Sequence, residues 1–178
     1  MRGACDMMKL CGILCILSGS TGLGLIFARE LALRIAELKQ LWQCMLLLQG
    51  ELRYMHQPLP EAFLHLSAKT SSPFQEFFLH TAQELRQRSG RTAEEIWERN
   101  VKIYFKPLHI SRQEYRDVER LGGMLGYLDI QMQINMLDYY LEQLKTSLQQ
   151  AEEAYKGRCK LYRYMGMLGG AALAILVV

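Results

Sequence analysis

Apolar residues recur every three or four positions along two long segments, one toward each end of the chain. In the later segment these positions are Ile130, Ile134, Leu137, Leu141, Leu144, Leu148, Ala151 and Tyr155. Polar residues separate them and no proline interrupts them, which is the pattern of a long helix with one buried face. Asp129 is a suitable N-cap, because its carboxylate can accept a hydrogen bond from a first-turn N–H group. We therefore expect one continuous helix from Asp129 to the end of the chain.

The earlier segment has the same spacing and predicts a second long helix. Its apolar positions are Leu31, Ile35, Leu38, Trp42, Met45, Leu48, Leu52 and Met55. Pro58 and Pro60 follow, and a proline cannot continue a hydrogen-bonded helix. We expect this helix to end at Met55.

Four shorter helices are predicted between the two long ones, each with its own start signal. The signals are Pro60 in a first turn and the capping boxes Ser72–Gln75, Thr92–Glu95 and Ser111–Glu114. Gly122, Gly123 and Gly126 are expected to lead into the turn before Asp129. No stretch alternates between apolar and polar residues for long, so strands are not expected. The predicted fold class is all-α, a bundle of about six helices.

The run from Leu10 to Ala28 carries no charged residue and follows a basic start at Arg2 and Lys9. As a helix it is about 28 Å long, close to the roughly 30 Å of a bilayer core. A signal peptide cleaved after Ser18-Gly-Ser20 is the alternative, but the apolar run continues past that point. The pattern favours a retained transmembrane helix.

The last residues, 164–178, are also free of charge. They reach only about 22 Å as a helix, which is short for a span. Tyr162 and Tyr164 can lie at the headgroup level, while Lys160 and Arg163 can extend toward it. We expect a second transmembrane helix here, so that both long helices of the bundle continue into the membrane.

Basic residues near the two predicted spans set the orientation. They are Arg2 and Lys9 on the outer side, and Arg29, Arg34, Lys39, Lys156, Arg158, Lys160 and Arg163 on the inner side. Since cytoplasmic flanks carry more Lys and Arg, the central domain is expected in the cytoplasm. The expected division is an extracytoplasmic N-terminus at 1–9, spans at 10–28 and 164–178, and a cytoplasmic helical domain at 29–163.

Small residues within the predicted spans are spaced for close helix packing. The pairs are Ser18 with Gly22, Ser20 with Gly24, and Gly166 with Gly170 and Ala174. The stretch Gly19–Gly24 lacks the lysine of a phosphate-binding loop and follows no predicted strand. We expect these faces to hold the two spans together or to pair two copies of the chain.

Composition and charge exclude several function classes. The 178 residues are 50% hydrophobic with a net charge of +3, which is too mild for a nucleic-acid-binding protein. The five cysteines, at positions 5, 11, 15, 44 and 159, form no CxxC pair, so we expect buried thiols and no metal site. Glu61 and His65, like Glu76 and His80, are predicted surface pairs one helical turn apart.

No catalytic residue, cofactor or small-molecule substrate is therefore expected, and we predict that the protein is not an enzyme. A membrane enzyme or a ligand sensor is the alternative from another class. It would need a polar pocket among the short helices and a titratable group with a strongly shifted pKa.

Three segments resemble the stage III sporulation protein AB family. They are residues 52–63, residues 121–129 with Gln133, and residues 159–166 running into the apolar C-terminus. The resemblance covers essentially the whole chain in the right order. The sequence departs from the family pattern at Gln49, where an acidic residue is common, and at Gln57, where a small hydroxyl residue is common.

The resemblance implies a role in endospore formation, in the mother-cell membrane. The family is similar to the cytoplasmic helical domain of F-type platform proteins in type II secretion and type IV pilus machines. It implies partners from the same operon, namely a secretion-type ATPase and ring-forming channel subunits, with a second copy of the chain as a further candidate. A membrane-anchored scaffold or adaptor unrelated to a secretion motor remains the alternative.

Candidate partner contacts are Tyr54, His56, Leu59 and Glu61, at the expected membrane-distal bend. The same residues have an equal claim to a purely structural role in ending the helix. Asp129 and Gln133 are expected to cap the last helix rather than to bind a partner. The stretch from Leu121 to Gly126 is expected to serve helix packing.

Overall fold

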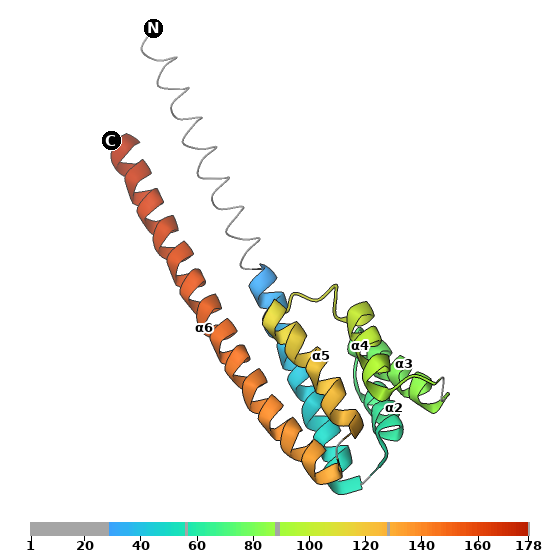
Figure 1. The fold of residues 1–178 in the computed structure, drawn as a ribbon. Helices are drawn as coiled ribbons and strands as arrows, with labels where there is room; N and C mark the ends of the chain where they lie inside the picture. Colours follow the sequence, from blue (N-terminus) through green and yellow to red (C-terminus); the bar gives the residue numbers. More distant parts are fainter. Residues whose placement is uncertain (1–28, 56, 88–89, 128, 178) are drawn as a thin grey trace. The chain divides into compact units, whose positions relative to one another are not determined.

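The computed structural model describes residues 29–55, 57–87, 90–127 and 129–177 (Figure 1). Residues 29–50 are α-helical, followed by η1 (Glu51–Met55), α2 (Leu59–Lys69), α3 (Phe74–Arg86), α4 (Ala93–Tyr104), α5 (Arg112–Tyr127) and α6 (Ile130–Val177). Every regular element in these ranges is helical, which confirms the predicted all-α class. The last helix has the predicted bounds to within a residue.

The chain divides into two compact units. One consists of Arg34–Gln150, and the other of Met1–Leu33 together with Ala151–Val178. Over the part of the chain that the structure describes, no helix contains a stretch both long enough and apolar enough to cross a bilayer. The expected span at 10–28, with its small residues Ser18, Ser20, Gly22 and Gly24, lies outside the described residues.

Aromatic rings from α2, α3 and α4 fill the centre of the Arg34–Gln150 unit. The rings are those of Phe63, Phe74, Phe77, Phe78, Trp97 and Phe105, and all are almost completely buried. Phe77 lies 4.9 Å from Trp97 and 5.0 Å from Phe105 between ring centroids, in edge-to-face contacts. Such pairs stabilise beyond their buried area. The three short helices, with Phe105 at the end of α4, therefore share one aromatic core.

Within this unit, helix 34–50 and the part of α6 up to Gln150 bury most of their predicted apolar positions. Leu38, Met45 and Leu48 are fully buried, and Ile134, Leu137, Leu141 and Leu144 of α6 are at most 8% exposed. However, Met55 is 63% exposed and Ile130 is 41% exposed. The prediction was wrong at both positions, which lie at one end of the unit.

The exposure of Met55 follows from the π-helical turn η1, which the spacing did not predict. A π-helix makes i to i+5 hydrogen bonds, so its residues take more positions to return to the same face. Leu52 is buried, but the position three residues later no longer points inward. The long helix thus ends at the predicted residue with a different last turn.

Glycines hold α4 close to α5. A Cβ atom on Gly122 would lie 2.1 Å from Trp97, and one on Gly123 would lie 2.6 Å from Glu94. The indole nitrogen of Trp97 donates a hydrogen bond of 2.8 Å to the Val118 carbonyl across the same contact. The predicted packing role of residues 121–126 is confirmed. As predicted, they also lead toward the turn before Asp129, since α5 runs through them and ends at Tyr127.

Two of the three predicted capping boxes are present. Thr92 with Glu95 and Ser111 with Glu114 exchange both hydrogen bonds of the motif. The box at Ser72 was wrong, because α3 begins at Phe74 without a side-chain cap. Ser72 instead donates its hydroxyl hydrogen bond to the Glu76 carboxylate at 2.9 Å.

Candidate partner-binding surface at the 51–61 bend

A buried carboxylate holds the segment 51–61, which we call the 51–61 bend. Glu51 is 6% exposed and accepts a hydrogen bond of 2.8 Å from Lys69 Nζ. Its other oxygen lies 3.3 Å from His65 Nδ1. The hydrogen bond from Lys69, helped by His65, outweighs burial and lowers the pKa of Glu51. Because both partners belong to α2, Glu51 fixes the end of the long helix to the helix after the bend.

A second carboxylate joins the bend to α6. Asp138 accepts hydrogen bonds from Gln49 Nε2 at 2.6 Å and from Arg53 Nη2 at 2.9 Å. An amide at position 49 can donate to this carboxylate, whereas an ionised carboxyl there could not. Gln49, which departs from the family pattern, thus has a hydrogen-bond partner in this chain, Asp138.

The bend presents uncharged side chains to solvent between these two anchors. Tyr54 is 77% exposed and Met55 is 63% exposed. Among the other predicted contacts, Leu59 is half-buried, and Glu61 forms an ion pair of 3.2 Å with Arg86. His56 lies outside the described residues. Of the three predicted contacts that the structure describes, Tyr54 is the most exposed to solvent.

A cavity of about 380 Å³ adjoins the bend. It is lined by Gln57–Pro60 of the bend, by Leu125 and Gly126 of α5, and by Ile130 and Gln133 of α6, with Leu85 and Ala93 completing the wall. The structure therefore brings the Pro-Leu-Pro turn together with the glycine-rich end of α5. The Oε1 atom of Gln57 is buried here without a hydrogen-bond partner among the described residues.

Asp129 and Gln133 serve the two helices that meet at this cavity. The Asp129 carboxylate accepts a hydrogen bond of 2.8 Å from the Met132 N–H, which confirms its predicted role as a cap. Gln133 donates 2.6 Å to the Leu125 carbonyl, so it satisfies the end of α5 rather than the start of α6. Gln133 therefore caps a helix end as predicted, but that helix is α5 and not the last helix.

Histidines and cysteines are the residues that the sequence offers for chemistry, and in the structure His65, His80 and Cys44 lie in packing or hydrogen-bond contacts. His65 lies against Glu51 rather than Glu61, and His80 stacks on Tyr104 with ring centroids 5.7 Å apart, so neither predicted surface pair forms. Cys44 is a buried free thiol, and burial raises its pKa to about 12. Within the described ranges, no group of three or more side chains could hold a metal ion. Gly166, Gly170 and Ala174 belong to α6.

Sequence reasoning missed the exposure of Met55 and Ile130, which adds apolar surface to the bend. It also missed Glu51, Lys69 and Asp138 as the groups that anchor the bend. A signal for Glu51 was present, since an acid beside Leu52 interrupts an apolar face. Nothing local could identify Asp138, whose partners are more than eighty residues away in the sequence.

The fold and the 51–61 bend define the class of this protein as an all-α module that exposes Tyr54 and Met55 on a bend held by side-chain ion pairs. Comparison with known proteins shows the family. A model of the stage III sporulation protein AB family matches residues 9–178. Stage III sporulation protein AB of Bacillus subtilis (strain 168) is 27% identical over 172 residues, covering 97% of this chain and all of that protein.

A solved structure is similar as well. It is that of a stage III sporulation protein AB (SpoIIIAB), with a TM-score of 0.63 and 26% identity, covering 70% of this chain and 97% of the solved one. The chain belongs to the stage III sporulation protein AB family.

Proposed function

We propose that this protein is a non-enzymatic membrane platform of a sporulation channel complex. In this role the Arg34–Gln150 unit docks the secretion-type ATPase of the same operon through the 51–61 bend. In this proposal the protein is similar to F-type platform proteins and also binds ring-forming channel subunits. Its location is the mother-cell membrane.

The observation that carries the docking proposal is the exposure of Tyr54 and Met55 on an anchored bend. Exposed aromatic and methionine side chains are enriched at protein interfaces, and tyrosine often dominates binding energy there. Glu51 and Asp138 fix the backbone beneath them through four side-chain contacts. Such a surface loses little conformational entropy when a partner binds, which favours docking.

The membrane part of the proposal rests on the sequence. The uncharged run 10–28 has the length of a span, and the run 164–178 would complete a second with the help of Lys160 and Arg163. Membranes from cells that make the chain, washed in alkaline carbonate, test this directly. Retention in the pellet together with an intact N-terminus supports two spans, whereas release or cleavage after Ser20 contradicts them.

The docking proposal is tested by capture of the operon's ATPase on the full chain in an uncharged detergent, with and without ATP. The variants are Tyr54→Glu and Glu61→Lys, both on the exposed bend. Tyr139→Glu is the matched control, because Tyr139 is 63% exposed on α6 and lies outside the bend. We expect at least tenfold weaker capture for Tyr54→Glu and unchanged capture for Tyr139→Glu.

Two results would contradict docking at the bend. One is equal capture by all variants, which would place the ATPase contact elsewhere. The other is no capture by the native chain while channel subunits still copurify with it. The protein would then be an assembly scaffold that does not touch the motor.

A further inference from the structure

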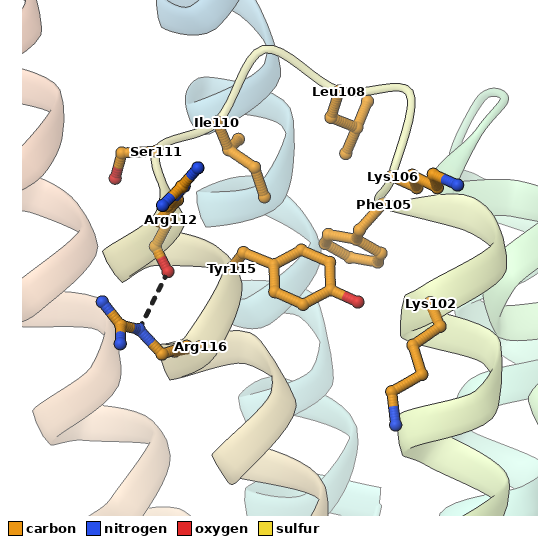
Figure 2. A pocket seen from close by; sticks show the side chains of 9 residues that line it. All are labelled: Lys102, Phe105, Lys106, Leu108, Ile110, Ser111, Arg112, Tyr115 and Arg116. Carbon is orange, nitrogen blue, oxygen red and sulfur yellow. Dashed lines mark hydrogen bonds between the residues drawn. The ribbon is translucent and has the colours of Figure 1, made fainter.

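A second surface feature lies at the junction of α4 and α5. A cavity of about 610 Å³ opens there, which we call the basic pocket (Figure 2). Four of its nine lining residues are cations, namely Lys102, Lys106, Arg112 and Arg116, and none is acidic. With a net charge of only +3 on the whole chain, this is a local concentration of positive charge.

Three of the four cations have no carboxylate partner among the residues that the structure describes. Lys102 lies 3.6 Å from both Glu98 and Glu119, so its charge is partly balanced. Lys106, Arg112 and Arg116 form no ion pair within the described part of the chain. Unpaired cations around the rim of one hollow create a positive potential there and attract anions.

The wall between the cations is apolar and preformed. Phe105, Leu108, Ile110 and Tyr115 contribute to it (Figure 2). Phe105 is backed by Phe74 and Phe77 of the core, with ring centroids at 5.5 and 5.0 Å. The pocket therefore needs no rearrangement of its floor to receive an apolar group.

Polar contacts fix the position of the α5 side of the pocket. Arg116 Nε donates a hydrogen bond of 3.3 Å to the Arg112 carbonyl, drawn as the dashed line in Figure 2. The loop before α5 is tied to helix 34–50 by His109, whose N–H donates 2.6 Å to the Glu37 carboxylate. The Tyr115 hydroxyl is a hydrogen-bond donor at neutral pH, as any tyrosine is, and burial with the Glu119 carboxylate raises its pKa further.

The Ser111–Glu114 capping box occupies part of the N-terminus of α5. The Ser111 N–H donates 2.6 Å to the Glu114 carboxylate, and the Glu114 N–H donates 3.2 Å to Ser111 Oγ. Phosphate sites at helix ends use such N–H groups. The charged residues that line the basic pocket are all cations, and they are spread around an apolar floor. This arrangement matches several carboxylates along a peptide better than one compact phosphate.

We propose that the basic pocket binds an acidic peptide segment of a partner protein, with one aromatic or aliphatic side chain of the peptide inserted against Phe105 and Tyr115. Its carboxylates pair with Lys106, Arg112 and Arg116. The 51–61 bend is separate from this site: Arg34, which binds Glu114 beside the pocket, precedes Tyr54 by roughly 30 Å along the long helix. The inference therefore stands independently of ATPase docking at the bend.

The test is fluorescence anisotropy with the full chain in an uncharged detergent. The probe is a fluorescein-labelled peptide in which glutamates flank a central Phe-Leu pair. Two control peptides replace the glutamates by glutamines or the Phe-Leu pair by two glycines. We expect binding of the probe that weakens with added salt, and at least tenfold weaker binding of either control.

The matched variants are Lys106→Glu with Arg112→Glu, against Lys145→Glu, a change of an exposed cation on α6. A glutamate at position 112 lies in the first turn of α5, where the helix dipole favours negative charge, so folding should be retained. Lys106→Glu alone, on an exposed residue after α4, replaces the double variant if circular dichroism shows loss of helix. We expect at least tenfold weaker binding for the pocket variants and less than twofold change for Lys145→Glu.

Three results would overturn the proposal. The first is equal binding of the probe and its glutamine control, and the second is probe binding by the pocket variants at the native level. The third is binding of short-chain phosphatidylglycerol, dependent on Lys106 and Arg112, with no binding of the peptide. That last outcome would make the basic pocket a lipid headgroup site.

Discussion

A buried glutamate holds each end of the segment 34–55, but the surfaces at the two ends differ in chemistry. One is the 51–61 bend and the other is the basic pocket. At one end Glu51, 6% exposed, pairs with Lys69 and His65 beneath the 51–61 bend, which exposes Tyr54 and Met55. At the other end Glu114, 4% exposed, binds Arg34 at 2.6 Å beside the basic pocket. A buried carboxylate can therefore anchor either surface, and the side chains around it decide what that surface offers to a partner.

The two carboxylates differ in the solvent exposure of their partners. Arg34 is 27% exposed, whereas Lys69 and His65 are 53% and 47% exposed. Ion pairs weaken as water reaches them. Glu114 also caps α5, and its contacts outweigh a burial effect that by itself would raise its pKa. We infer that the end at Glu114 depends more on its ion pair than the end at Glu51 does.

Gly122→Ala should have the largest effect on stability. The contact between α4 and α5 lies next to both surfaces, since residues of these helices line the basic pocket and the cavity at the 51–61 bend. The new Cβ would lie 2.1 Å from Trp97, so the two helices must separate. We expect a loss of about 2 kcal/mol of unfolding free energy from overpacking. Gly50→Ala is the control, since nothing lies within 4 Å of its Cβ position, and it should gain up to about 1 kcal/mol. Chemical denaturation measures both, and equal stabilities would show that the close approach is not real.

Glu114→Gln should be next in size. Glutamine keeps the capping geometry and removes the charge opposite Arg34. We expect a loss of about 2 kcal/mol, against about 1 kcal/mol for Glu51→Gln, whose partners are better hydrated. Glu142→Gln, on a 76% exposed residue, is the control and should change stability by less than about 0.5 kcal/mol. A larger loss at Glu51 would reverse the comparison of the two ends.

Acid should weaken both ends in the same direction. Each glutamate has a pKa below its ordinary value of 4.5 in the folded protein, so the unfolded chain binds protons first as the pH falls. The stability from these pairs is complete above that value and is lost as the pH falls through the lowered folded pKa. Denaturation between about pH 6 and about pH 3 should show a flatter pH dependence in Glu51→Gln with Glu114→Gln than in the native chain. An unchanged slope would assign acid sensitivity to other groups.

Much of the fold follows from the sequence, because apolar spacing and capping residues act over one or two helical turns. Thr92, Ser111 and Asp129 lie at the predicted helix starts for this reason. The failures have long-range or subtle causes. The contact of Gly122 with Trp97 joins residues twenty-five positions apart, and the π-turn at Glu51–Met55 changes which residues face outward.

The candidate sites were less predictable than the fold. The 51–61 bend could be located from its prolines, but its anchors come from α2 and α6, far along the chain. The basic pocket joins Lys102 and Lys106 to Arg112 and Arg116 across the end of one helix and the start of the next. In the sequence these residues look like ordinary exposed charges, since only the fold shows that they share one hollow.

Tyr54→Glu should have the smallest effect on stability. The side chain is 77% exposed, so its replacement should change the free energy of unfolding by less than about 0.5 kcal/mol. Circular dichroism melts of the native chain and the variant measure this. A substantial loss would mean that Tyr54 packs against the unit, and its exposure would no longer support a docking role.

The most direct test of docking at the bend is photo-crosslinking from position 54 in cells that make the chain with the rest of its operon. A benzophenone side chain replaces Tyr54 in one strain and Tyr139 in a control strain, both on highly exposed positions. The account predicts a crosslink to the ATPase from position 54 and none from position 139. Crosslinks to the ATPase from position 139 alone, or from neither position while both proteins are present, would contradict it.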